Sequence, residues 1–279
     1  MTTSYFELYD EARRKLFQLM DGDEDARQLL LYAFGISMNT LLLHFTEKFE
    51  ENERTRYFRE IVERRAGHEP LQYITGVQNF FGLDFKVNEN VLIPRQDTEV
   101  LVEKILTENT GKDLRVLDLC TGSGCIAVTL KKLGGYAEVT GSDISRDALL
   151  IADENAREND ADITFYESDM FGQMKDAGRF DLIVSNPPYI RRAVLETLMP
   201  EVRDHEPRIA LDGDADGLAF YRIIAEEARG FLTGSGRLYL EIGFDQAADV
   251  RRILEEKGYR NLEITKDLSQ LDRIVRADV

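Results

Sequence analysis

The chain has 279 residues, of which 43% are hydrophobic and 31% charged, and its 35 basic and 52 acidic side chains give a net charge of −17. These values are ordinary for a globular protein and allow one large domain with a smaller one. The excess of acids disfavours an extended nucleic-acid-binding surface. No apolar run is long enough to span a membrane, and residues 1–20 carry charges throughout. We therefore expect a cytoplasmic protein without a signal peptide or a membrane segment.

The chain has two cysteines, Cys120 and Cys125, and three scattered histidines. These are too few and too far apart for a Cys/His zinc cluster, so no metal site is expected. Because disulfides are rare in the cytoplasm, both cysteines are expected to be free, buried thiols.

The first part of the chain is predicted to contain only helices, which form a small domain over residues 1–75. Apolar side chains recur at helical spacing in three segments, and a glycine is expected to end each helix. The segments are residues 5–20, 25–35 and 46–67, and the glycines are Gly22, Gly35 and Gly67.

Residues 76–95 change in character and are predicted to form a β-hairpin that bridges two domains. β-Branched and aromatic residues surround turn-forming residues at Gly76, Gly82 and Asn88. This pattern is typical of short strands joined by tight turns.

Residues 96–279 alternate between helical and strand patterns, which predicts an α/β domain with a doubly wound, mostly parallel, seven-stranded sheet. The last two strands are expected to form a hairpin that adds one antiparallel member. Strands are predicted at 115–120, 138–144, 163–170, 180–185, 237–243, 261–267 and 272–279, and helices at 97–109, 125–133, 145–159, 217–232 and 246–257.

The first strand of this domain continues into DLCTGSGCIA, residues 118–127. Gly122, Gly124 and Ala127 match the G-x-G-x-x-G/A pattern of nucleotide-binding turns, although any tight turn favours glycine. Asp143 ends the next strand, 21 residues after Gly122, where a carboxylate can bind ribose hydroxyls of NAD or S-adenosylmethionine. Asp118 beside the loop favours S-adenosylmethionine, because an acid repels a pyrophosphate and attracts an ammonium or a sulfonium.

A third acid, Asp169, is predicted at the end of the third strand, where its carboxylate can accept a hydrogen bond from the adenine amine. Met170 beside it can flank the purine ring. Each acid alone fits a polar strand end. Three of them at one carboxyl edge of a sheet favour a nucleoside cofactor.

The fourth strand ends in Asn186, Pro187, Pro188 and Tyr189. The two prolines remove two backbone donors and so end the strand, but one would suffice. The motif resembles the NPPY signature of amino-group methyltransferases. Asn186 Oδ1 and the Pro187 carbonyl can accept both hydrogens of a planar NH2 group, and Tyr189 can stack on it. Proline rigidity holds these acceptors in place, and no general base is required because the methylated nitrogen becomes acidic.

The chain as a whole resembles the peptide chain release factor glutamine methyltransferases. The matching stretches are EPLQYITG (69–76), FFG (80–82), IPRQDTE (93–99), DLCTGSGCIA (118–127), SNPPYI (185–190) and HEPRIALDGDADGL (205–218). The resemblance implies a Rossmann-like fold, S-adenosylmethionine as methyl donor, and class-1 release factors as protein substrates held by the helical domain and the hairpin. It implies neither a nucleic-acid nor a membrane partner, and we expect a monomer.

The resemblance also assigns residue roles. Asp118 and the backbone around Thr121, Gly122, Ser123 and Gly124 would bind the methionine part of the cofactor. Asp143 would bind the ribose, and Asp169 with Met170 the adenine region. The catalytic residues would be Asn186, Pro187 and Tyr189, with Pro188 completing the substrate contact and Asn186 also touching the cofactor.

Two positions depart from the common family pattern: Cys120 stands where glycine is frequent, and Met170 where an aromatic residue is frequent. Both changes bear on cofactor affinity. Pro94, Arg95 and Thr98 either cover the cofactor or form a loop before a helix capped by Asp97 or Thr98.

Two other functions remain open from the sequence. A nucleic-acid adenine or guanine methyltransferase would use the same pocket chemistry, but it would need a basic groove. A noncatalytic adaptor would bind a protein through the helices and only hold the cofactor. The presence of both the glycine loop and NPPY disfavours the adaptor.

Overall fold

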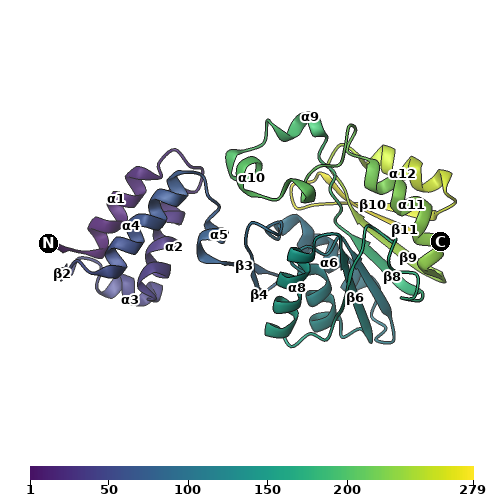
Figure 1. Cartoon of the computed structure of the whole chain (residues 1–279), viewed down its shortest axis with the longest axis horizontal. Helices are drawn as coiled ribbons and strands as arrows, with labels where there is room; N and C mark the ends of the chain where they lie inside the picture. Colours follow the sequence, from purple (N-terminus) through teal and green to yellow (C-terminus); the bar gives the residue numbers. More distant parts are fainter. The chain divides into compact units, whose positions relative to one another are not determined.

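The computed structural model describes all 279 residues, which form two compact units (Figure 1). The first unit contains Met1–Gly76 and Met199–His205, and the second contains Val77–Leu198 and Glu206–Val279. No helix in either unit combines the length and the apolar character that crossing a bilayer requires.

The first unit is a bundle of short helices around one apolar core. Its core side chains include Leu8, Leu29, Phe58 and Ile61, all at most 1% exposed. The helices are α1 (Tyr5–Lys15), α2 (Gly22–Phe34), α3 (Met38–Leu43), α4 (Glu53–Ala66), α5 (Leu71–Thr75) and α10 (Pro200–His205), and the two-residue strands β1 (Thr2–Thr3) and β2 (Phe49–Glu50) pair antiparallel.

Two predicted helix boundaries in this unit were wrong. Gly22 begins α2 rather than ending the first helix, which stops earlier, at Lys15. The third segment becomes helical only from Glu53, because Asn52 Oδ1 accepts hydrogen bonds from the first free backbone N–H groups of α4. Gly35, by contrast, ends α2 in the left-handed conformation, at φ 61°.

Arg65 of α4 is a buried cation that joins α10 to the bundle. Its Nε donates to Asp25 Oδ2 at 2.7 Å, and its Nη2 donates to Glu201 Oε1 at 2.6 Å. Arg65 and Asp25 are 6% and 5% exposed. Burial raises the pKa of Asp25 even though the guanidinium opposes the rise, so this carboxylate depends on its partner.

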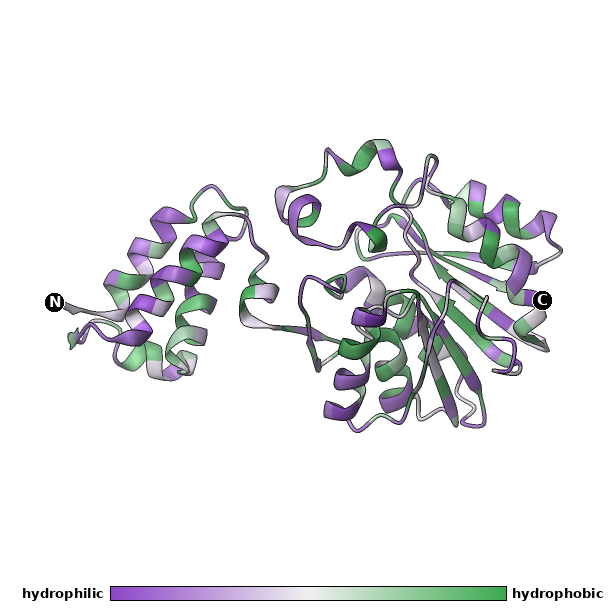
Figure 2. Ribbon diagram, viewed as in Figure 1, coloured by the Kyte–Doolittle hydropathy of each residue, from purple (hydrophilic) through white to green (hydrophobic).

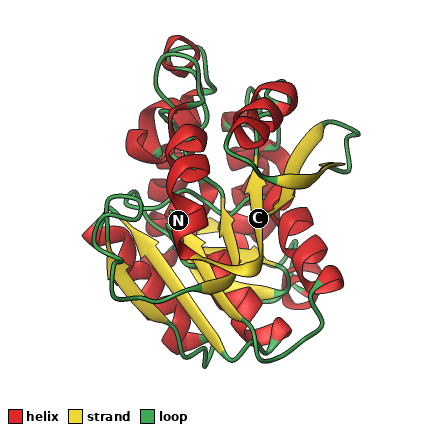
Figure 3. Ribbon diagram, turned by 90° about the vertical axis from the view of Figure 1, so that its right-hand side faces the viewer, coloured by secondary structure: helices red, strands yellow, loops and turns green.

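The second unit is built on a single seven-stranded sheet with the order β10-β11-β9-β8-β5-β6-β7 (Figure 3). β11 runs antiparallel to both of its neighbours, β10 and β9, and the other neighbouring strands pair parallel, which confirms the predicted mostly parallel sheet and its closing hairpin. The strands are β5 (Arg115–Leu119), β6 (Glu138–Asp143), β7 (Thr164–Glu167), β8 (Phe180–Ser185), β9 (Leu232–Glu241), β10 (Arg260–Lys266) and β11 (Asp272–Asp278).

Helices cover both faces of the sheet (Figure 1), because successive strand residues point to opposite sides. Val116 of β5 packs into the core that contains α6 and α7, and Leu117 into the core that contains α11 and α12. The strands carry both apolar and polar residues (Figure 2), and the central strands β5 and β8 are the most apolar of the sheet. The helices are α6 (Gln96–Glu108), α7 (Cys125–Thr129), the π-helical η1 (Leu130–Gly134), α8 (Arg146–Glu158), α9 (Arg192–Leu195), the 3-10 turn η2 (Arg208–Ala210), α11 (Ala219–Phe231) and α12 (Ala247–Glu256).

The predicted hairpin is present as β3 (Val77–Phe80) and β4 (Leu83–Lys86), which pair antiparallel and belong to the second unit. Phe80 and Phe85 are buried in the core beneath α6 and α7. The Asn155 side chain of α8 binds both the N–H and the C=O of Lys86, at 2.7 and 3.0 Å. The hairpin is thereby fixed to the sheet domain.

Candidate active site

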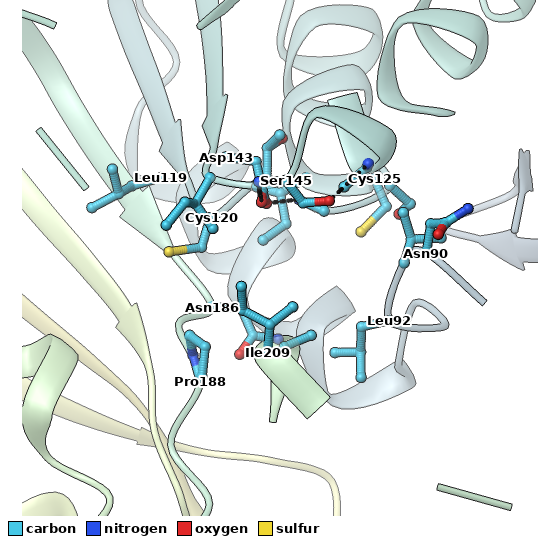
Figure 4. A pocket seen from close by; sticks show the side chains of 18 of the residues that line it. Asn90, Leu92, Leu119, Cys120, Cys125, Asp143, Ser145, Asn186, Pro188 and Ile209 are labelled. Carbon is cyan, nitrogen blue, oxygen red and sulfur yellow. Dashed lines mark hydrogen bonds between the residues drawn. The ribbon is translucent and has the colours of Figure 1, made fainter. Parts of the chain in front are cut away.

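A cavity of about 260 Å³ lies in the second unit at the carboxyl ends of β5, β6, β7 and β8 (Figure 4). Strand order reverses between β5 and β8, and parallel α/β sheets bind their ligands at such a reversal. The segment before α6 and the turn η2 contribute the remaining walls. Eight sequence-predicted site residues line the cavity: Thr121, Gly122, Ser123, Asp143, Asp169, Met170, Asn186 and Pro188.

The glycine loop between β5 and α7 uses left-handed backbone at three positions. Cys120, Gly122 and Gly124 have φ values of 61°, 54° and 78°. A Cβ added to Gly122 would meet no atom within 4 Å, whereas one on Gly124 would lie 3.1 Å from the Ala152 Cβ. Gly122 therefore keeps the cavity open, and Gly124, which does not line it, allows α8 to approach α7.

Asp118 lies behind the loop and is not part of the cavity wall. Its side chain is fully buried, and its Oδ2 accepts hydrogen bonds from Thr121 Oγ1 at 2.6 Å and from the Ala127 N–H at 3.1 Å. Oδ1 has no hydrogen-bond partner. Burial raises the pKa of this carboxyl to about 7. The residue thus shapes the loop and leaves one oxygen unsatisfied beside it.

Asp143 ends β6 and lines the cavity beside Ser145 (Figure 4). Its Oδ2 accepts from the Gly122 N–H and its Oδ1 from the Ser145 N–H, both at 2.9 Å. Burial raises the pKa of this carboxyl, and the backbone hydrogen bonds oppose the rise. Each carboxylate oxygen retains a lone pair that can accept from a ligand hydroxyl.

Asp169 and Met170 line the cavity beyond β7, which ends two residues before Asp169, at Glu167. Asp169 is exposed, whereas Met170 is 6% exposed. Met170 has φ 49°, and its Sδ lies 3.9 Å from Cys120 Sγ. The two positions at which the chain departs from the family pattern are therefore in contact.

The NPPY segment follows β8 directly, and Asn186 with Pro188 faces the cavity. Asn186 Nδ2 donates to Thr98 Oγ1 at 3.2 Å, and Thr98 Oγ1 donates to Glu241 Oε2 at 2.7 Å. Thr98 and Glu241 are 2% and 1% exposed. Asn186 is therefore oriented by a chain of hydrogen bonds that begins at a buried carboxylate at the end of β9.

Tyr189, expected to stack on the substrate, does not line the cavity. Its ring packs against the core beneath α11 and α12, and its hydroxyl donates to Glu241 Oε1 at 3.4 Å. Burial raises its pKa well above the usual range. The Gln246 Nε2 group donates to the Tyr189 carbonyl at 3.0 Å. The tyrosine thus anchors the turn. Pro187 is likewise buried outside the wall.

Two loops complete the cavity, one with Pro94 and Arg95 and the other with Ile209. Arg95 forms an ion pair with Glu206, which joins the loops. Arg95 is also the only basic side chain in the cavity wall. The N-cap of α6 is Arg95 and makes no side-chain cap bond, so the predicted capping by Asp97 or Thr98 was wrong. The Thr98 hydroxyl binds Glu241 instead.

Both cysteines are free thiols, and both line the cavity. Cys125 is buried, as expected, whereas Cys120 is only half-buried. Burial raises the pKa of Cys125 to about 12 and that of Cys120 further above its usual range. Both are therefore neutral at physiological pH and do not act as nucleophiles. No group of His, Cys, Asp and Glu side chains has the geometry of a metal site.

The sequence analysis missed Glu241 and did not single out Ile209, Leu92 or Phe220, which line the cavity with the expected residues. A glutamate between apolar residues at the end of a predicted core strand was the available signal for Glu241. Leu92 lies in a loop and Ile209 in the short turn η2, where periodicity carries little information. Phe220 lies in α11, and helical periodicity does not report which residue of a helix faces a cavity.

The chemistry of the cavity suits a nucleoside with a positively charged end. Asp143 can accept from sugar hydroxyls, and the two acids of the cavity wall, Asp143 and Asp169, favour a cation over an anion. A pyrophosphate lacks a partner here, because Arg95 is already paired with Glu206.

Comparison with known proteins gives matches over both units. A family model for the methyltransferase small domain matches residues 95–201, and one for the PrmC N-terminal domain matches residues 7–76. A release factor glutamine methyltransferase from Geobacter sulfurreducens is 45% identical over 258 residues, which cover 91% of this chain and 90% of that protein. One from Agrobacterium fabrum is 42% identical over 272 residues, with coverages of 95% and 94%.

Among solved structures, a methyltransferase from Pyrococcus furiosus superposes with a TM-score of 0.54 at 17% sequence identity. The match covers 71% of this chain and 90% of that one. At this identity the similarity concerns the fold, and it confirms the Rossmann-like methyltransferase architecture of the sheet domain.

Proposed function

This chain belongs to the family of release factor glutamine methyltransferases, and we propose that it methylates the side-chain amide nitrogen of a glutamine in a class-1 peptide chain release factor. S-Adenosylmethionine is the methyl donor. The observation that carries the proposal is the position of Asn186 and Pro188 in the wall of a cavity whose other residues suit a cationic nucleoside.

The cofactor site is formed by the loop after β5 and by the ends of β6 and β7. Thr121, Gly122 and Ser123 surround the methionine part, and Asp143 binds the ribose hydroxyls. Asp169 and Met170 contact the adenine, while Asp118 and Gly124 support the loop from behind. When bound, S-adenosylmethionine supplies a methyl group activated by a sulfonium.

The target amide is held by acceptors at the end of β8. Asn186 Oδ1 accepts one of its hydrogens, and the carbonyl of Pro187, a residue that is buried outside the cavity wall, accepts the other. The two acceptors aim the nitrogen lone pair at the methyl group. An amide nitrogen is a poor nucleophile, so catalysis rests on positioning, which can supply up to about 7 to 11 kcal/mol. Tyr189 keeps the turn rigid through its own hydrogen bonds. No general base is needed, since the methylated nitrogen releases its proton readily.

The alternatives of the sequence analysis are less well supported. A nucleic-acid methyltransferase would need a basic surface at the cavity mouth, and the only basic residue of the cavity wall is paired. A noncatalytic adaptor would not require a fixed Asn186 side chain, yet Asn186 is held in one orientation through Thr98 by the buried carboxylate of Glu241. We propose that the protein acts as a monomer on a protein substrate and needs neither nucleic acid nor a membrane.

The test is methyl transfer to a purified class-1 release factor, read by mass spectrometry of its peptides. We expect one added CH2 group on a single glutamine side chain, only when S-adenosylmethionine is present. Parallel incubations with tritiated donor and with DNA or RNA test the nucleic-acid alternative. Label on nucleic acid, or no label on any substrate, would overturn the proposal.

A further inference from the structure

Glu241 is a buried carboxylate for which the proposed reaction has no direct use. It lies at the end of β9, is 1% exposed, and receives hydrogen bonds from Thr98 Oγ1 and Tyr189 Oη. Its own carbonyl accepts from Tyr221 Oη at 2.9 Å. Burying a carboxylate is costly unless its partners compensate. A leucine or isoleucine would fill a strand end without that cost.

The hydrogen bonds from Glu241 have a defined direction. An ionised carboxylate only accepts, so Thr98 must give it its single hydroxyl proton. The Thr98 oxygen then has only lone pairs left, and it can only accept from Asn186. A flipped Asn186 amide would place Oδ1 against that oxygen, so that two acceptors would face each other and the hydrogen bond would be lost.

We propose that Glu241 and Thr98 are positioning residues that fix the orientation of the Asn186 amide. They keep Nδ2 turned toward Thr98 and leave Oδ1 as the acceptor for the substrate. The inference rests on the proposed function, in which Asn186 Oδ1 accepts from an NH2 group. It predicts that the site prefers a primary amide to a carboxylate of the same shape.

The bonds join three distant parts of the chain. Thr98 lies in the first turn of α6, Asn186 follows β8, and Glu241 ends β9. Arg273 lies close enough to favour the ionised form of Glu241, while Asp97 opposes it. Burial raises the pKa of Glu241 to about 7, so assays at about pH 8 keep the acceptor form.

Thr98→Val removes the hydroxyl while conserving shape. We expect kcat to fall by about 10- to 100-fold, the cost of one unfixed polar group in a buried site. The Kd for S-adenosylmethionine should stay within about threefold of the wild-type value. Thr98→Ser restores the hydroxyl and should recover most of the activity. Thr129→Val is the matched control, because Thr129 is also fully buried and its hydroxyl has no partner.

The decisive readout is discrimination, which a structural role would not change. A release factor with the target glutamine replaced by glutamate is used as a competitive inhibitor. The wild-type enzyme should bind it poorly, because Asn186 Oδ1 faces a carboxylate. In Thr98→Val the Asn186 side-chain amide is free to flip and can turn its Nδ2 group toward the substrate carboxylate. We therefore expect the preference for glutamine over glutamate to shrink by about tenfold.

Glu241→Gln gives a second, independent measurement should Thr98→Val fail to fold. Glutamine keeps the shape but can donate as well as accept, so it no longer sets the direction of the bonds. Reduced discrimination in either variant supports the inference. The inference is overturned if a folded variant prefers glutamine over glutamate as strongly as the wild-type enzyme does. It is also overturned if the Kd for S-adenosylmethionine rises by the same factor as kcat falls. If the wild-type enzyme itself transfers no methyl group, the proposed function fails instead.

Discussion

Cys120 Sγ lies 3.9 Å from Met170 Sδ, so the two positions at which the chain departs from the common family pattern form one contact in the cavity wall. Both residues hold left-handed backbone, at φ 61° and 49°. Glycine adopts this conformation without steric cost, so the backbone at Cys120 suits the glycine that the family resemblance leads one to expect there.

Cys120→Gly should therefore be tolerated. Relief of left-handed strain and loss of the sulfur contact nearly cancel, and we expect the free energy of unfolding to stay within about 1 kcal/mol of the wild-type value. Cys120→Val, with a β-branched side chain, should lose about 2 kcal/mol or more. Urea denaturation of both variants measures the difference. Equal stabilities would show that backbone conformation does not govern this position.

Replacing Gly122 by alanine should mainly lower cofactor affinity, whereas replacing Gly124 by alanine should mainly lower stability. At Gly122 the added Cβ meets open space, and only the left-handed backbone, at φ 54°, opposes it. The variant should therefore fold with a loss of about 1 kcal/mol in stability but lose at least about tenfold in affinity for S-adenosylmethionine. At Gly124 the added Cβ meets Ala152, and we expect a loss of about 2 kcal/mol or more in stability. Calorimetric titration and thermal unfolding test the pair. The reverse assignment of effects would contradict the proposed cofactor site.

Asn186→Ala should abolish methyl transfer while leaving the Kd for S-adenosylmethionine within about tenfold of the wild-type value. The variant removes an acceptor for the target amide but leaves the loop after β5 intact. Asn159→Ala, at the end of α8, is the control and should transfer normally. Loss of cofactor binding in folded Asn186→Ala would make this residue mainly a cofactor ligand.

Arg65→Met should destabilise the first unit strongly. It leaves Asp25 buried without its cation and frees Glu201 of α10, at an expected cost of about 3 kcal/mol or more. Arg56→Met on the same helix removes an exposed arginine with a weak ion pair and should cost no more than about 0.5 kcal/mol. Chemical denaturation followed by helical circular dichroism compares them. Similar losses would mean that the buried ion pairs contribute no more than an exposed one.

Stability should fall as the pH rises from about 4 to about 7, in part because of Asp118. Its pKa is about 7 when folded against 3.8 in the absence of the fold, so the folded state binds the proton more tightly in this interval. Because of Asp118, the free energy of unfolding should fall by at most about 1.4 kcal/mol per pH unit within this interval. Outside the interval this carboxyl contributes no pH dependence. The nearby charge of Asp143 adds to the effect of burial.

Asp118→Asn removes this titration. The difference in unfolding free energy between wild type and variant, measured at pH values of about 5, 6 and 7, should move in favour of the variant as the pH rises. Glu241, whose pKa is also raised to about 7, is present in both proteins, so its contribution cancels. A difference that does not change with pH would show that Asp118 is ionised throughout.

Much of the fold follows from local pattern. Apolar runs such as 115–119 and 180–185 alternate with amphipathic helices, and only a sheet covered on both faces buries them all. The glycine loop, Asp143 and NPPY were each recognisable because a strand end, a left-handed turn and a double proline are encoded over a few residues. Gly22 misled the sequence analysis, because glycine favours a break in a helix but does not say on which side the next helix begins.

The amino-acid sequence by itself determined the order of strands and helices, the cavity edge and the residue types of NPPY. Only the tertiary structure decided that Thr98 and Glu241 orient Asn186, and that Tyr189 anchors the turn instead of lining the cavity. The reason is physical. Periodicity reports which side of an element is buried, whereas the hydrogen bond between Thr98 and Glu241 depends on the distance between a helix and a strand, to within a fraction of an ångström.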